Sequence, residues 1–153
     1  MRFLLAFAGL TQLILLLAVL STMPVANAQP YTGEEVKAAL TTHIIKNVQW
    51  PQQNNRERLH IAVWQSSDAF RFLSPLNGLS VGNQLIQVQL AEQMSNLEQA
   101  QLVYIAESEL SALPSLVSQL RGKGILLITE NSPTLHNVMI NFVEEPGQSN
   151  SRQ

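Results

Sequence analysis

Cysteine is absent from all 153 residues of the chain. Its absence excludes a disulfide, a thiolate nucleophile and a zinc site built on cysteine. It also excludes a lipid anchor attached through a cysteine thiol. Noncovalent packing must therefore stabilise the fold, and redox state cannot switch it through a disulfide.

Residues that carry acid–base or metal chemistry are also scarce. The three histidines are His43, His60 and His136, and no two of them have the spacing of metal ligands on one helix. Asp68 is the single aspartate, and no serine lies in a G-x-S-x-G motif. The glycines do not form a G-x-G-x-x-G motif. The sequence therefore predicts no catalytic residue, no metal site and no cofactor.

Basic charge is sparse as well. Nine Lys and Arg residues face eleven Asp and Glu residues, which gives a formal net charge of −2. Phosphate binding needs a concentrated basic face, so nucleic acid is excluded as the expected partner.

The first 28 residues have the build of an export signal. Arg2 precedes an apolar run, and Ala26-Asn27-Ala28 forms an A-x-A cleavage site. The alternative is a membrane anchor, because residues 3–20 approach the ~20 apolar residues that span a bilayer. The polar pair Thr11-Gln12 inside the run and the cleavage site after it favour a signal peptide at 1–28, cleaved after Ala28, and a soluble periplasmic product.

After removal of 28 residues, 153 − 28 = 125 remain, enough for one domain with its own core. A capping box at Thr32 and Glu35 predicts the start of a first helix. Pro51 disfavours the helical conformation in the residue before it, so this helix is expected to end near Trp50. Residues at helical spacing predict its buried face: Val36, Ala39, Leu40, His43, Ile44 and Val48.

Strand patterns alternate with two further helices. Strands are expected at 59–64, 85–90, 102–106, 125–129 and 138–143, with both faces of the first one covered. One helix is capped near Ser66, and another has Pro114 in its first turn and ends at Gly122 and Gly124. The pattern predicts an α/β fold, a three-layer αβα domain at 29–145 with a mostly parallel sheet of about five strands. Residues 146–153 are predicted to be a polar, disordered tail.

Two carboxylates stand beside a predicted strand end. Glu107 and Glu109 follow the strand that begins at Leu102. Open α/β sheets bind ligands at the carboxyl ends of their strands, so these two residues could line a ligand crevice. A helix start is the alternative reason for acids at this place.

Several segments, taken together, resemble the YfiR-like family of exported regulatory domains. Val36-Lys37-Ala38-Ala39 and the Trp50-Pro51 pair are similar to the family's opening signature. Five later segments follow in the family's order: "IAVWQSSDAF", "LNGLSVGNQLIQV", "LVYIAESE", "ILLITE" and "VMINFV". The resemblance covers nearly all of 36–143.

This resemblance implies a periplasmic αβα domain that is not an enzyme. Such a domain binds and modulates a membrane signalling protein, such as a diguanylate cyclase that controls cyclic-di-GMP and biofilm formation. The implied partner is the periplasmic part of an inner-membrane protein. The signature residues Lys37, Ala38, Ala39, Trp50 and Pro51 are interpreted as structural, with Trp50 as a plug between the first helix and the sheet.

The chain departs from the family pattern at three places. Gln101 stands where the family often has a cysteine, and His136-Asn137 replaces a Gly-Gly pair. The family normally continues past the position of Gln153 through an "F-E-I-N" strand and a final helix. Two alternatives to a free regulator therefore stay open: the exported sensor domain of a longer receptor such as a histidine kinase, and a small-molecule-binding or hydrolytic periplasmic protein.

Overall fold

The computed structural model describes residues 31–50, 57–134 and 138–144. The chain divides into two units, 1–31 and 32–153, and the described helices and strands all lie in the second. Its elements, in chain order, are α2 (Gly33–Asn47), β1 (Arg58–Trp64), α3 (Ser67–Leu73), the 3-10 turn η2 (Ser74–Leu76), β2 (Ser80–Val81), β3 (Gln84–Ala91), η3 (Met94–Leu97), β4 (Leu102–Ile105), η4 (Glu107–Ala112), α4 (Leu113–Leu120), β5 (Leu126–Glu130) and β6 (Ile140–Phe142).

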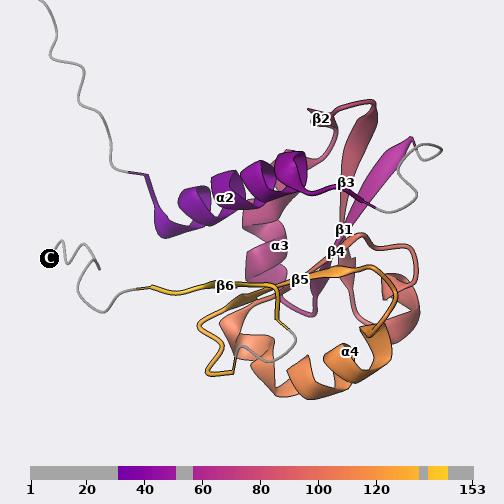
Figure 1. Ribbon diagram of the computed structural model, residues 1–153. Coiled ribbons are helices and arrows are strands. Elements are labelled where there is room, and N and C mark those ends of the chain that lie inside the picture. Colours follow the sequence, from indigo (N-terminus) through magenta and orange to yellow (C-terminus); the bar gives the residue numbers. More distant parts are fainter. Residues whose placement is uncertain (1–30, 51–56, 135–137, 145–153) are drawn as a thin grey trace, which may run out of the picture. The chain divides into compact units, whose positions relative to one another are not determined.

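Six strands form a sheet in the order β2-β3-β1-β4-β5-β6 (Figure 1). All pairings are parallel except that of β2 with β3. The prediction of a mostly parallel sheet is confirmed. The sixth strand, which the sequence pattern did not reveal, is β2, and it has only two residues.

Helices cover both faces of this sheet, as expected for three layers. In Figure 1, α2 and α3 lie on one side and α4 on the other. Alternate residues of β1 enter two separate cores, because successive side chains of a strand point to opposite faces. Leu59, Ile61 and Val63 pack with α2 and α3, whereas Ala62 and Trp64 pack with α4. The prediction that both faces of β1 are covered is therefore confirmed.

Local signals set most element boundaries where the sequence predicted them. The Thr32 Oγ1 atom accepts a hydrogen bond from the Glu35 backbone N–H (3.2 Å), and a Glu35 carboxylate oxygen accepts one from the Thr32 N–H (2.8 Å). Ser66 caps α3 in the same way through the Ala69 N–H. Gly122 and Gly124 follow α4 with φ of 77° and 69°, a conformation that glycine adopts without steric cost.

The end of α2 differs from the prediction. Its last residue is Asn47, and Val48 is already extended at φ −85° and ψ 132°. The Asn47 side-chain amide donates to the His43 carbonyl (2.7 Å), one turn earlier in the helix. Trp50 therefore lies beyond the helix in a connecting segment, not in its last turn. Pro51 lies outside the described residues.

The predicted buried face of α2 is wrong for four of its six residues. Val36, Ala39, Leu40 and His43 are exposed, and Val36 and Leu40 keep 44% and 45% of their surface in contact with solvent. The face that packs on the sheet is rotated from the predicted one, and its fully buried residues are Thr41 and Ile45. Only Ile44 and Val48 of the predicted set pack against the core.

Within the described part of the chain, no helix has both the length and the apolar character needed to span a bilayer. The predicted signal peptide and its cleavage site, and the predicted tail, lie outside the described residues.

Candidate functional site

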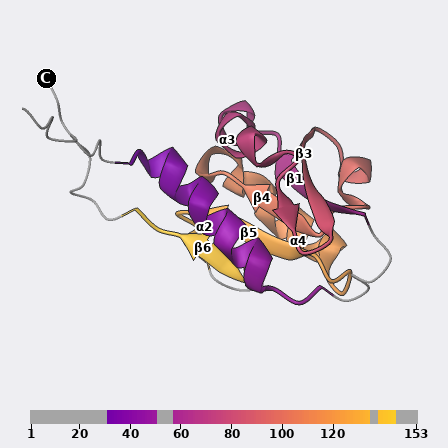
Figure 2. The same cartoon turned by 90° about the horizontal axis from the view of Figure 1, so that it is seen from above.

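A lysine and two glutamates meet between α2 and the ends of β5 and β6. Figure 2 shows α2 running across this edge of the sheet. Lys37 lies on α2, Glu130 is the last residue of β5, and Glu144 follows β6. The Lys37 Nζ atom is 3.2 Å from a Glu130 carboxylate oxygen and 2.7 Å from one of Glu144. The Lys37 and Glu130 side chains are only 15% and 11% exposed, whereas that of Glu144 is 62% exposed. The lysine thus ties α2 to the carboxyl ends of two strands.

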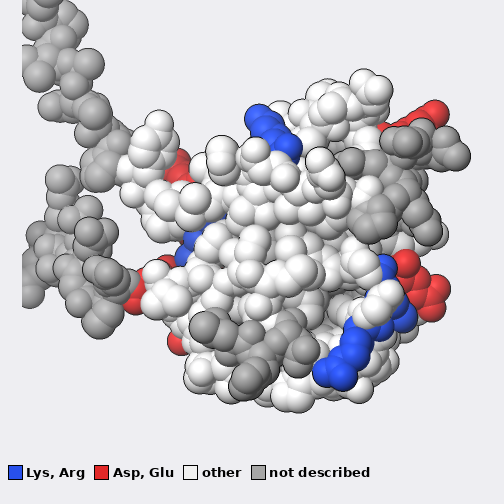
Figure 3. Space-filling model, in the orientation of Figure 1, with Lys and Arg blue, Asp and Glu red and all other residues white. Residues whose placement is uncertain are grey.

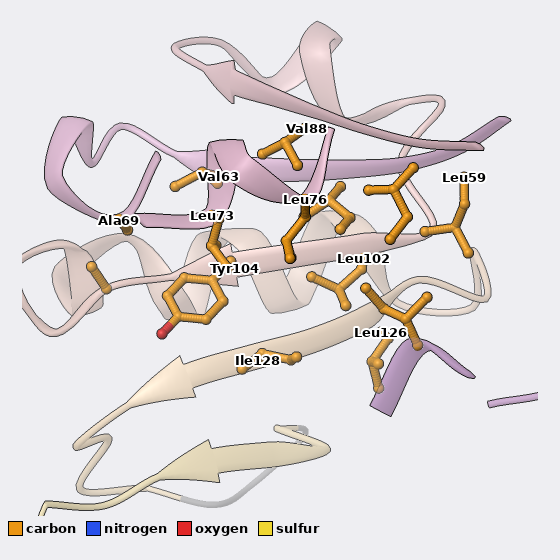
Figure 4. Packing of buried hydrophobic residues seen from close by; sticks show 14 of the residues in the cluster. Leu59, Val63, Ala69, Leu73, Leu76, Val88, Leu102, Tyr104, Leu126 and Ile128 are labelled. Atoms are coloured by element: carbon orange, nitrogen blue, oxygen red, sulfur yellow. The ribbon is translucent and has the colours of Figure 1, made fainter. Parts of the chain in front are cut away.

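Tyr104 extends this cluster into the core. Its ring is fully buried and stands edge-on to Phe72, with ring centroids 5.7 Å apart. Its hydroxyl donates a 2.5 Å hydrogen bond to Glu130. Figure 4 shows the ring among aliphatic side chains, with the hydroxyl oxygen at the edge of the group. Glu130 therefore accepts from Tyr104 with one oxygen and pairs with Lys37 through the other.

The charge states follow from these contacts. Burial lowers the pKa of Lys37, but its hydrogen bonds to the two glutamates and their charges outweigh that effect, so the pKa lies above its ordinary value of 10.5. Burial, followed by the hydrogen bond to Glu130, raises the pKa of Tyr104. At neutral pH the lysine is cationic and the tyrosine is neutral. Neither is prepared as a base or nucleophile, because that role requires a lowered pKa.

Asn131 joins Glu107 to this cluster. It adopts a left-handed conformation with φ of 45°, which asparagine tolerates better than most residues. Its side-chain amide donates to a Glu107 carboxylate oxygen (2.7 Å), and its side-chain oxygen accepts from the Glu144 backbone N–H (3.0 Å). The contact found for Glu109 is instead with its neighbour, Ser108 (3.1 Å). Of the two predicted crevice residues, only Glu107 enters the network, and it does so by orienting Asn131.

The structure separates the five signature residues. Lys37 lies in the ion-pair cluster, Ala38 packs against the core and Ala39 faces solvent. Trp50 is 7% exposed and packs in the core between α2 and the sheet, whereas Pro51 lies outside the described residues. The signature thus contains one residue of the polar cluster, two core residues and one exposed residue.

The outward side of α2 carries three apolar residues and one histidine. Val36, Ala39, Leu40 and His43 follow one another at spacings of three, one and three residues, which places them on one side of the helix. We call these four residues the α2 outer face. It lies on the same helix as Lys37, opposite the residues that contact the sheet.

A search against known protein families finds one family model, described as YfiR/HmsC-like, that matches residues 34–150. The chain belongs to the YfiR/HmsC-like family. The matched residues of this YfiR/HmsC-like domain include α2 except its first residue, all six strands of the sheet and the whole polar cluster. A search among curated proteins gives no significant match.

At the position where the YfiR-like pattern often has a cysteine, this domain uses an amide. The Gln101 side-chain oxygen accepts a 2.6 Å hydrogen bond from the His60 backbone N–H, and the Gln101 backbone N–H donates to the His60 carbonyl (3.0 Å). The side chain therefore joins the start of β4 to β1. The His136-Asn137 departure lies outside the described residues.

The sequence pattern did not single out four residues of the cluster: Tyr104, Glu130, Asn131 and Glu144. The first two lie in segments that resemble the family, but the pattern of each segment indicates only a buried strand. A carboxylate at the end of a nearly all-apolar strand was the available signal for Glu130, since a buried charge needs a partner.

Proposed function

We propose that this YfiR/HmsC-like domain is a non-enzymatic regulatory protein that acts in the periplasm. Its partner is the periplasmic part of an inner-membrane signalling protein such as a diguanylate cyclase. Membership of the family across residues 34–150 is the observation that carries this proposal, because the family consists of periplasmic regulatory domains.

The state of the polar cluster supports a role without catalysis. Its cation is held in the charged form by two carboxylates, and its tyrosine is held neutral. Among the described residues, no group of three or more His, Asp or Glu side chains could hold a metal ion. The cluster instead fixes the position of α2 on the sheet.

The α2 outer face is the proposed contact surface for that partner. Binding energy at protein interfaces concentrates in a few apolar anchors, and an exposed apolar surface is typical of an interaction site. Val36 and Leu40 supply such anchors on a helix that Lys37 holds rigidly in place. Most of the side chains visible in Figure 3 are uncharged, which also favours a protein partner over a nucleic acid.

The test compares two substitutions of equal chemistry. Leu40→Glu places a charge on the α2 outer face, and Leu85→Glu places one at a β3 residue of similar exposure, 48% against 45%. Cells that lack the gene are complemented with each form, and cyclic-di-GMP and biofilm formation are measured. We expect wild type and Leu85→Glu to restore regulation and Leu40→Glu to fail, at equal protein levels. Full regulation by Leu40→Glu would exclude this surface, and an unchanged signalling response on deletion of the gene would contradict the function.

A further inference from the structure

A groove runs along one flank of α4. Its volume is about 630 Å³, which lies within the ~300–1,000 Å³ range of small-molecule sites. One wall is made by Leu113, Pro114, Val117 and Ser118, which lie on one flank of α4, with Leu110 of η4 before them and Arg121 just after the helix. This wall is apolar except at Ser118 and Arg121.

The opposite wall is residues 132–134, after β5, and hydrogen bonds hold it in place. The Asn141 side-chain oxygen accepts from the Ser132 backbone N–H (2.9 Å), and the Asn141 amide donates to the Ser132 carbonyl (3.1 Å). The Ser132 hydroxyl donates to the Thr134 carbonyl (2.8 Å). Because β6 positions Asn141, this wall is preformed by the sheet.

The Arg121 guanidinium at the end of the groove has no hydrogen bond or ion pair with any residue in the described part of the chain. Only its backbone N–H is engaged, with the Val117 carbonyl. Arginine stays protonated at all relevant pH values and presents five donors in a fixed fork. In Figure 3, basic side chains gather near the end of α4. The groove therefore offers a largely apolar wall that ends in a guanidinium without a partner among the described residues.

We propose that this groove binds a small organic anion with an apolar body, such as an aryl or alkyl carboxylate. The apolar part lies along Leu113, Pro114 and Val117, and the carboxylate accepts hydrogen bonds from Arg121. A carboxylate matches the guanidinium fork with two parallel hydrogen bonds. This site is independent of the α2 outer face and does not rest on the proposed regulatory function.

The probes are 4-phenylbutyrate and its uncharged amide, which share one shape. Each is titrated into the ¹⁵N-labelled protein, and the amide chemical shifts are followed. We expect saturable shifts at the groove residues, with phenylbutyrate binding more tightly than the amide. Arg121→Gln should weaken phenylbutyrate binding roughly five- to tenfold and leave amide binding unchanged, since the lost contact is a partly solvated charge-assisted pair.

Two matched controls make the result specific. Lys123→Gln removes a cation two residues further on that does not line the groove, so it should leave the affinity for phenylbutyrate unchanged. Ser118→Trp fills the groove from an exposed position and should abolish binding, whereas Gln119→Trp, next to it and outside the groove, should not. All four positions are exposed, so the variants are expected to fold, and circular dichroism checks this.

Three results would overturn the proposal. They are the absence of saturable shifts in the groove, equal affinity of wild type and Arg121→Gln for phenylbutyrate, and equal weakening by Arg121→Gln and Lys123→Gln. The last of these results would indicate that phenylbutyrate is attracted to positive charge in general and does not occupy a specific site.

Discussion

Replacement of Lys37 by methionine tests whether the ion-pair cluster holds α2 on the sheet. The change keeps the length of the side chain and removes its charge, which leaves the buried Glu130 carboxylate without a cation. Breaking a fully buried ion pair costs about 3 to 5 kcal/mol. The Lys37 and Glu130 side chains are 15% and 11% exposed, and Glu130 keeps its hydrogen bond from Tyr104. We therefore expect a loss of about 2 to 3 kcal/mol in the free energy of unfolding.

The assay is thermal and urea unfolding followed by circular dichroism. For a domain of this size, 1 kcal/mol corresponds to roughly 3 to 4 °C in Tm, so the expected fall is about 6 to 12 °C. Lys46→Met is the matched control, because Lys46 is an exposed lysine of the same helix. It should change Tm by under ~2 °C, as surface charges contribute little.

A double-mutant cycle separates the ion pair from other effects of the substitution. Glu130→Gln removes the carboxylate charge, so adding Lys37→Met to it should cost much less than Lys37→Met costs in the wild type. Neighbouring charges coupled in this way show interaction energies of about 1 to 3 kcal/mol. Additive effects, or a Lys37→Met protein as stable as Lys46→Met, would refute the claim that this pair fixes α2.

Three further predictions concern pH, the core and processing. In the folded state the pKa values of Lys37 and Tyr104 are both raised above their ordinary values of 10.5 and 10.0, so the two groups stabilise the fold fully below about pH 10 and lose this effect as the pH rises further. The free energy of unfolding of the wild type should therefore fall more steeply on alkaline titration than that of the Lys37→Met/Tyr104→Phe double variant, and equal slopes would contradict this. Trp50→Ala should cost about 3 to 5 kcal/mol because the ring is buried in the core, and a fall in Tm of under ~2 °C would show that the ring does not stabilise the fold. Export should remove residues 1–28, so N-terminal sequencing of the periplasmic fraction is expected to begin at Gln29; an intact chain in the membrane fraction would instead favour the anchor.

Local chemistry explains which parts of the fold were predictable. The caps at Thr32 and Ser66 and the glycines after α4 act on residues next to them in the sequence, so the pattern located these boundaries. The strands were found for a similar reason, because burial on both faces gives continuous apolar runs. Two-residue β2 has no such run and forms only because it pairs with β3.

The orientation of α2 could not be read from hydrophobic periodicity. Thr41 is buried because its hydroxyl donates to the Lys37 carbonyl (2.8 Å) one turn earlier, so the helix itself satisfies this polar group. The Lys37 side chain points inward because it forms ion pairs with Glu130 and Glu144. Both glutamates lie far from Lys37 in the sequence. A hydrophobic pattern that assigns Lys and Thr to the solvent side therefore selects the side of α2 opposite to the one that packs on the sheet. That error identified the α2 outer face, where apolar residues lie in solvent.

Binding of the domain to a membrane signalling protein through the α2 outer face is the central claim, and a comparative pull-down tests it most directly. Wild type, Val36→Glu/Leu40→Glu and Leu85→Glu forms are immobilised and incubated with solubilised inner membranes, with and without reductant, and the bound proteins are identified by mass spectrometry. We expect wild type and Leu85→Glu to retain the same diguanylate cyclase or other membrane signalling protein, the α2 double variant to lose it, and reductant to change nothing, since the chain has no cysteine. Equal retention by all three forms would contradict the proposed surface, and recovery of no membrane signalling protein by the wild type would contradict the regulatory function itself.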